Sequence, residues 1–197
     1  MSQFIESIKV EDQKAFLLDL HQQRVRETFA HFGKECSIDL EKIFKDLEHD
    51  EDGLYKLRIV YDLEGNFRAQ MLPYAFPEIE TFELVENNDF SYDFKFVDRT
   101  EFEKMKKKAR AQEIIIVKNG QITDTSFSNL LFLKNQTWYT PKSFLLNGIQ
   151  RQNLLKQGII KETEITLENL NEFSHFQLIN SMNEFNQDFV YSIEELK

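Results

Sequence analysis

Apolar and polar residues alternate with two different periods in the first part of the chain. Residues 4–10 (FIESIKV) and 54–61 (LYKLRIVY) alternate at every second position, which is typical of strands with one buried face. In residues 15–32 and 38–48 the apolar side chains recur every three or four positions, as in an amphipathic helix. The pattern therefore predicts a strand, two helices and a second strand in this order.

The rest of the chain has shorter apolar runs between turn residues. Asn119-Gly120 is the strongest of these turn signals and predicts a hairpin. Helices are expected to begin near Thr100 and at Ile149. We expect further strands at residues 67–72, 79–85, 94–100, 113–117, 130–133, 161–165 and 189–192.

The length and composition fit one large or two small domains. The chain has 197 residues, of which 41% are hydrophobic, and this is enough to form a real core. The polar segment 87–89 (NND) has the composition of a linker. We therefore expect a small N-terminal α/β domain at residues 1–86 and a larger C-terminal domain at residues 90–197.

Charge and cysteine content exclude several classes of function. The net charge of −10 argues against nonspecific nucleic-acid binding, so the basic run 104–110 is expected to be a solvated helix face. No apolar run approaches the roughly 20 residues of a membrane span. Cys36 is the single cysteine, which fits a reducing, cytoplasmic compartment, and the N-terminus lacks the apolar stretch of a signal peptide. The acidic segment 48–52 should be a surface loop, and because it lacks a paired spacing we expect no metal site.

The stretch from residue 120 to 151 carries the strongest candidate chemistry. Asp124 opens a small polar run (DTSFSN), and residues 145–151 read LLNGIQR. Gly148 lacks a Cβ, so a backbone there can approach a phosphate closely. A helix that starts at Ile149 would direct its free N–H groups and its positive dipole end at that phosphate. Taken singly, these residues are more often a turn residue and an ordinary helix start, and only the combination indicates a phosphate-bearing cofactor.

Two basic side chains elsewhere could serve the same cofactor. Lys95 lies between two phenylalanines, and desolvation favours the neutral, nucleophilic form of an amine. Arg24 follows His21 by three positions on the first helix, and a guanidinium fork suits an anion. The alternatives are a surface lysine on an edge strand and a solvated helix arginine, with His21 in a structural role.

Three ordered motifs resemble those of the fold-type IV pyridoxal-phosphate (PLP) enzymes, which include the class IV aminotransferases and aminodeoxychorismate lyase. They are Asp/Glu-x-x-x-Ser-Asn-Leu from Asp124, Trp-x-Thr-Pro at 138–141 and Leu-Leu-x-Gly-Ile-x-Arg at 145–151. The resemblance extends from about residue 4 to 192. It implies a mixed α+β, D-amino-acid aminotransferase-like fold with two α/β subdomains, and a homodimer. The family usually has glutamate at position 124, and a glycine- and arginine-rich stretch of many relatives is missing here.

The resemblance also implies roles for individual residues. Lys95 would carry PLP and act as general base, and Asp124 would keep the pyridine nitrogen protonated, which makes the ring an electron sink. Arg58 and Arg99 are candidates for a substrate carboxylate, although strand cations commonly face solvent. The full set expected to bind the cofactor is Arg24, Lys95, Asp124, Asn129, Gly148, Ile149, Gln150, Ser181 and Met182.

Among activities, the short chain with the motifs Lys-x-x-Asp-Arg-Thr from Lys95 and Asp-Thr-Ser-x-Ser-Asn from Asp124 resembles aminodeoxychorismate lyase. This enzyme acts on a small-molecule amine and releases pyruvate and p-aminobenzoate for folate biosynthesis. Two alternatives remain open. One is an aminotransferase for D- or branched-chain amino acids, and the other is a non-catalytic PLP-binding protein, against which the intact Lys95 argues. Neither nucleic acid nor membrane is expected as a partner.

Overall fold

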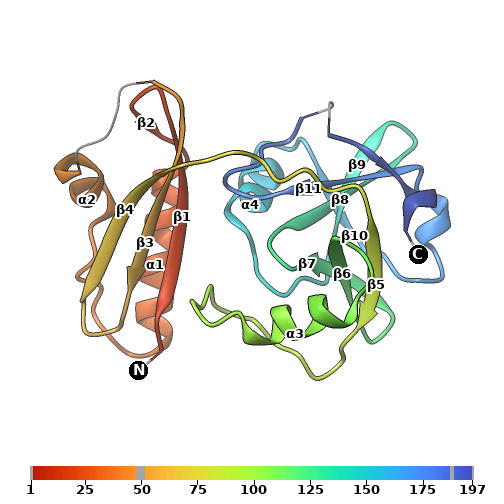
Figure 1. Cartoon of the computed structure of the whole chain (residues 1–197), viewed down its shortest axis with the longest axis horizontal. Helices are drawn as coiled ribbons and strands as arrows, with labels where there is room; N and C mark the ends of the chain where they lie inside the picture. The colour runs from red at the N-terminus through yellow and green to blue at the C-terminus, as the bar shows by residue number, and fades with distance from the viewer. Residues whose placement is uncertain (1, 48–51, 187–188, 197) are drawn as a thin grey trace. The chain divides into compact units, whose positions relative to one another are not determined.

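The computed structural model of the chain describes residues 2–47, 52–186 and 189–196. The chain divides into two compact units (Figure 1). The first comprises Met1–Phe76 and Phe94–Asp98, and the second comprises Pro77–Asp93 and Arg99–Lys197. Most of the acidic segment 48–52, which was expected to be a surface loop, lies outside the described residues.

The first unit is a four-stranded antiparallel sheet with two helices. The sheet has the order β2-β1-β3-β4. Its elements are β1 (Phe4–Glu11), β2 (Lys14–Ala15), α1 (Leu18–His31), α2 (Leu40–Asp46), β3 (Leu54–Tyr61) and β4 (Phe67–Pro73). Alternate side chains of β1 are buried, as the period of two predicts. They share one apolar core with Val25 and Phe29 of α1 and with Leu40 and Ile43 of α2.

The first helix begins three residues later than its sequence pattern predicts. Asp12 and Gln13 both adopt positive φ angles, of 49° and 61°. These angles belong to a two-residue hairpin turn, so Lys14–Ala15 pairs with the end of β1 before the helix starts. The hairpin therefore includes Ala15, which the amphipathic pattern assigns to the helix.

The predicted strand at residues 94–100 is wrong, because this segment forms an isolated bridge, between Phe96 and Phe4 of β1, and no strand. The carbonyl of Lys95 accepts the Ile5 N–H at 2.9 Å, and the Val97 N–H donates to the carbonyl of Gln3 at 2.9 Å. The Phe96 N–H donates to the carbonyl of Phe94 at 2.9 Å, which places Lys95 at the centre of a tight three-residue turn. Phe94 and Phe96 pack against the core of the first unit, so packing of these rings holds the turn in place.

The second unit contains two sheets. The smaller has the order β5-β6-β7, and the larger has the order β10-β9-β8-β11-β12. The strands are β5 (Phe82–Glu86), β6 (Glu113–Lys118), β7 (Gln121–Thr125), β8 (Asn129–Lys134), β9 (Thr137–Pro141), β10 (Lys161–Thr163), β11 (His175–Ile179) and β12 (Tyr191–Ser192). The helices are α3 (Thr100–Lys108), α4 (Ile149–Lys156) and the short 3-10 turns η1 (Leu170–Glu172) and η2 (Ile193–Glu195).

Two predicted boundaries in the second unit matter for the site. Asn119 and Gly120 have φ angles of 51° and 74°, so the predicted hairpin between β6 and β7 is confirmed. The helix predicted from Ile149 is α4 and begins at that residue. Within the described residues, no helix is both long and apolar enough to cross a membrane.

Candidate active site

The first unit buries a carboxylate in its core. Glu6 occupies an inward position of β1 and has no solvent exposure. A charge at such a position needs close partners, and two come from α1. Arg24 donates through Nε to Oε1 of Glu6 at 2.9 Å and through Nη2 to Oε2 at 2.5 Å. His21 lies with Nδ1 2.5 Å from the same Oε2. The helical spacing of three places both side chains on one carboxylate.

The partners determine the charge state of this cluster. Burial alone would raise the pKa of Glu6, but the Arg24 charge and the His21 hydrogen bond outweigh it and lower the pKa to about 2. Burial lowers the pKa of His21; Glu6 opposes this, while the positive charges of Arg24 and Lys95 lower it further. His21 is therefore neutral at pH 7, with its proton on Nδ1 facing Glu6, and its buried Nε2 has no hydrogen-bond partner among the described residues.

The first unit thus brings Arg24, His21 and Lys95 into electrostatic contact. Lys95 is half-buried in the turn on the edge of β1, and its charge acts on His21. The Arg24 side chain is not the solvated helix arginine of the alternative interpretation, because it is 11% exposed and ion-paired. Its described hydrogen bonds use Nε and Nη2, so within the described residues Nη1 remains without a partner.

The second unit buries a carboxylate as well, with different partners. Asp124 lies in β7 and is 5% exposed. Its Oδ1 accepts the Asn129 side-chain amide at 2.8 Å, and its Oδ2 accepts the backbone N–H groups of Leu145 and Leu146, both at 2.9 Å. All of these donors are neutral. Burial raises the pKa of Asp124 to about 6, although the hydrogen bonds and the charge of Arg151 oppose the shift.

Asn129 connects Asp124 to the start of α4. Its Nδ2 also donates to the carbonyl of Leu146 at 2.9 Å. A Cβ placed on Gly148 would lie 2.0 Å from Oδ1 of Asn129, so the space beside this glycine is filled by Asn129. Gly148 is the N-cap residue of α4 and gives no side-chain cap. The first N–H groups of α4, on Ile149 and Gln150, are consequently available to an anion.

Arg151 holds the loop before α4 in place. It is 2% exposed, and it donates through Nη1 to Asn147 Oδ1 at 3.0 Å and through Nη2 to the carbonyl of Pro141 at 3.1 Å. Its guanidinium also lies 4.5 Å from the centre of the Phe144 ring. Arg151 belongs to a quoted motif but received no role from the sequence.

Glu6 was missed altogether, although its inward position in the period-two pattern of residues 4–10 was a signal for a partnered buried charge. Its partners could not be predicted, because both Arg24 and His21 come from a separate element.

Ser181 and Met182 lie in the turn after β11. Ser181 is half-buried and Met182 is 3% exposed. The Met182 N–H already donates to Oδ1 of Asn180 at 2.8 Å. The Asn180 side chain also approaches the carbonyl of Phe127 at 3.5 Å, which joins this turn to the turn between β7 and β8. The turn is thus tied to the strands that carry Asp124 and Asn129.

The two candidate substrate arginines are placed differently. Arg99 donates through Nη1 to the Tyr92 hydroxyl at 3.3 Å and through Nη2 to the carbonyl of Ser126, and it lies 4.1 Å over the Phe102 ring. Its guanidinium therefore holds a turn of its own unit. Arg58 lies half-buried on β3 opposite Ser7 and Gln70, and no ion pair of it is found among the described residues.

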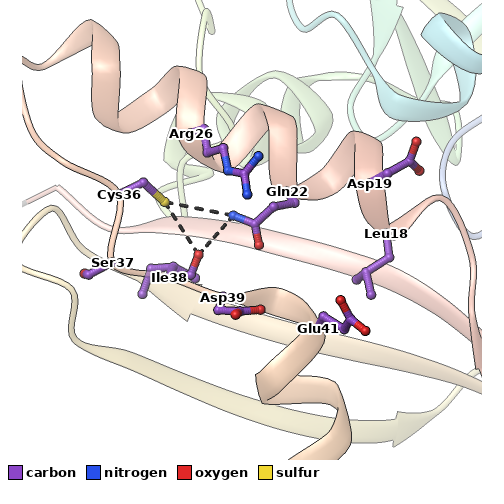
Figure 2. A pocket seen from close by; sticks show the side chains of 9 residues that line it. All are labelled: Leu18, Asp19, Gln22, Arg26, Cys36, Ser37, Ile38, Asp39 and Glu41. Carbon is purple, nitrogen blue, oxygen red and sulfur yellow. Dashed lines mark hydrogen bonds between the residues drawn. The ribbon is translucent and has the colours of Figure 1, made fainter.

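A separate cavity of about 590 Å³ lies beside α1 in the first unit (Figure 2). Gln22 crosses it, and its side chain accepts the Leu40 N–H at 2.8 Å and donates to the carbonyl of Ile38 at 2.9 Å. The thiol of Cys36 points toward the same carbonyl, at 3.6 Å. The residues that line this cavity include no member of the expected cofactor site.

Comparison with known proteins defines the class to which this fold and these residues belong. The chain matches the family described as amino-transferase class IV over residues 3–186. It therefore belongs to this family of PLP-dependent enzymes, and the predicted mixed α+β fold, the enzyme class and the cofactor are confirmed.

Individual relatives refine this assignment. An uncharacterised protein of Haemophilus influenzae is 30% identical over 187 residues, which are 93% of this chain and 99% of the relative. The crystal structure of a proposed 4-amino-4-deoxychorismate lyase from Haemophilus somnus 129PT is 34% identical, with a TM-score of 0.87 over 94% of this chain and 98% of that one. The branched-chain amino acid aminotransferase of Escherichia coli is 16% identical and shares the fold, with a TM-score of 0.74 over 97% of this chain and 75% of its own.

Proposed function

We propose that this chain is a 4-amino-4-deoxychorismate lyase, which releases pyruvate and p-aminobenzoate and so serves folate biosynthesis. The observation that carries this choice is the 34% identity to the Haemophilus somnus protein, which extends over nearly all of both chains. The aminotransferase from Escherichia coli is much less similar, and this chain covers only 75% of its length.

Each unit has residues that suit one part of PLP. Asp124 is a buried carboxylate whose close donors are all neutral, so a protonated ring nitrogen would supply the missing cation. The phosphate would be bound by Arg24 through Nη1, by the first N–H groups of α4 and by Ser181. When bound, PLP supplies an electron sink for the electron pair left on a substrate carbon after proton removal.

Lys95 is the proposed attachment point and the proton acceptor. The tight turn fixes its backbone against β1, and the adjacent Phe94 and Phe96 rings pack into the core, so the base of its side chain is anchored. When the substrate amine has displaced the Lys95 amine from the cofactor, the Lys95 amine would take a proton from one substrate carbon and return it to another atom of the same substrate. His21 is less suited to this role, because its Nε2 is buried and burial lowers the pKa of the imidazole, which disfavours the protonated form.

The remaining expected residues have supporting roles in this proposal. Asn129 orients Asp124 and fills the space beside Gly148, and Met182 stabilises the turn that presents Ser181. Arg58 is the proposed substrate carboxylate ligand, because Arg99 is already engaged by Ser126 and Tyr92. We further propose a homodimer that acts in the cytoplasm, as the family resemblance and the single cysteine favour.

The test is a product assay on aminodeoxychorismate without any added keto acid. We expect pyruvate and p-aminobenzoate in equal amounts from the wild type and neither from Lys95→Ala. Lys107→Ala, which removes an exposed lysine, serves as the matched control and should keep full activity. A panel of D- and branched-chain amino acids with 2-oxoglutarate or pyruvate should be run in parallel. Turnover of an amino acid without p-aminobenzoate would favour the aminotransferase, and PLP binding without any turnover would favour the non-catalytic protein.

A further inference from the structure

We propose that Glu6 is a positioning residue that sets the direction of Arg24 toward the phosphate of the cofactor. This inference rests on the proposed cofactor site and names the residue that determines the geometry of its arginine. Glu6 is fully buried, so it cannot contact a ligand itself. Its effect on any bound anion must pass through the side chains that it holds.

The contacts of Glu6 leave Arg24 a single orientation. The carboxylate binds two different nitrogens of the guanidinium, Nε and Nη2, so the plane of the fork is fixed as well as its position. The hydrogen bond from His21 to Oε2 holds the carboxylate from another side. The Arg24 carbonyl accepts the Thr28 hydroxyl at 2.9 Å within the same helix. These contacts leave Nη1 as the donor with a fixed direction and without a partner among the described residues.

The same ion pair removes most of the net charge that Arg24 would otherwise offer. Glu6 stays ionised across the working pH range, because its cationic and hydrogen-bonding partners outweigh burial. An anion bound at Nη1 would therefore meet a hydrogen-bond donor of fixed direction beside a negative charge. Neutralising Glu6 would remove the repulsion of the anion by this charge, but it would also release the guanidinium from its fixed direction, and these two effects on phosphate affinity are opposite. If charge alone matters, loss of the carboxylate strengthens phosphate binding; if direction matters, the loss weakens it.

The test compares PLP with pyridoxal, which lacks the phosphate. Dissociation constants of both compounds are measured by equilibrium dialysis for the wild type, Glu6→Gln, Arg24→Ala and the double variant. We expect Glu6→Gln to bind PLP about tenfold more weakly and pyridoxal unchanged, since a charged hydrogen-bond pair is lost. The double variant should bind PLP no more weakly than Arg24→Ala, because Glu6 acts through Arg24. Glu11→Gln removes the same charge from the partly exposed end of β1 and should leave both constants unchanged.

Arg24→Lys provides a second route if the Glu6 variant does not fold. Lysine keeps the charge but lacks the fork, so our inference predicts a loss of PLP affinity close to that of Arg24→Ala. Arg26→Lys on the exposed face of α1 is its control. Equal or tighter PLP binding in Glu6→Gln, additive losses in the double variant, or normal binding in Arg24→Lys would overturn the inference. A wild type that binds no PLP would instead refute the proposed function, and the inference with it.

Discussion

Glu6 in the first unit and Asp124 in the second are both almost fully buried, yet their pKa values are shifted in opposite directions. The pKa of Glu6 falls to about 2, because Arg24 and His21 outweigh the effect of burial. The pKa of Asp124 rises to about 6, because burial outweighs a set of donors that are all neutral. Both carboxylates accept three hydrogen bonds. The number of hydrogen bonds is therefore not what separates them.

The difference lies in where the compensating charge is found. Glu6 has its cation within the chain and can only organise its neighbours. Asp124 is held by neutral amides, and among the described residues no cation forms an ion pair with it; the charge of Arg151 acts on it but does not outweigh burial. Asp124 is therefore suited to a positive charge that arrives with a ligand. A protonated pyridine nitrogen has this property. A buried acid with neutral donors is thus a better pointer to a cofactor site than a buried acid in an ion pair.

Neutralising Asp124 should have the largest effect. Asp124→Asn removes the proposed partner of the ring nitrogen, and loss of one buried charge partner costs roughly 3–5 kcal/mol. If this loss is realised in the transition state, turnover should fall roughly 10²–10³-fold. Asp62→Asn is a suitable control, because Asp62 also accepts neutral donors but lies in an exposed turn. Near-normal steady-state turnover in Asp124→Asn would show that the raised pKa has no functional meaning.

Removing Arg24 should have the next largest effect and should act on the cofactor. Arg24→Ala deletes a charged donor, for which about 1.5–3 kcal/mol is typical, so PLP retention should fall about tenfold to a hundredfold. Ser181→Ala deletes a neutral donor and should cost less. Equilibrium dialysis against PLP measures both variants. Unchanged PLP retention in Arg24→Ala would show that Arg24 forms its ion pair with Glu6 but does not bind the cofactor.

A substitution at Gly148 probes how Asp124 is held. In Gly148→Ala the new Cβ would lie 2.0 Å from Oδ1 of Asn129, so Asn129 must move away from Asp124. Overpacking of this kind destabilises a protein by about 1–3 kcal/mol. Thermal unfolding should show the loss, and adding Asn129→Ala should recover part of it. If Gly148→Ala alone were as stable as the wild type, Asn129 would not be the reason that position 148 needs a glycine.

The opposite pKa shifts predict opposite pH dependences of stability in the cofactor-free protein. Because the folded pKa of Glu6 is lowered from 4.5 to about 2, its contribution is present above pH 4.5 and is lost as the pH falls toward 2. Because the folded pKa of Asp124 is raised from 3.8 to about 6, its folded form binds a proton more tightly than its unfolded form. Stability should therefore decrease as the pH rises from 3.8 to 6.

Urea unfolding across this range can separate the two groups. The difference between the wild type and Glu6→Gln should shrink below pH 4.5, while the pH dependence between 3.8 and 6 should flatten in Asp124→Asn. If both substitutions changed the pH dependence of the unfolding free energy in the same direction, the two carboxylates would not have opposite pKa shifts.

The sequence predicts those parts of the fold in which local pattern and packing agree. β3 was placed correctly at both ends, because its alternate side chains face one core. Residues 94–100 were wrongly predicted to be a strand, since Phe94 and Phe96 suit a strand locally but pack around a turn at Lys95. Asp124, Asn129 and Gly148 were predicted because the motifs that contain them resemble those of the PLP enzymes. Their mutual contacts could not be predicted, because Asp124 is bound by backbone amides that carry no sequence signal.

The most direct test of the account is the identity of the lysine that carries PLP. Reduction with borohydride makes the bond between a lysine amine and PLP permanent, and peptide mapping by mass spectrometry then locates the pyridoxyl group. We predict that the purified protein is yellow and that the group is found on the peptide that contains Lys95. A pyridoxyl group on any other lysine, or none on a protein incubated with PLP, would contradict the account.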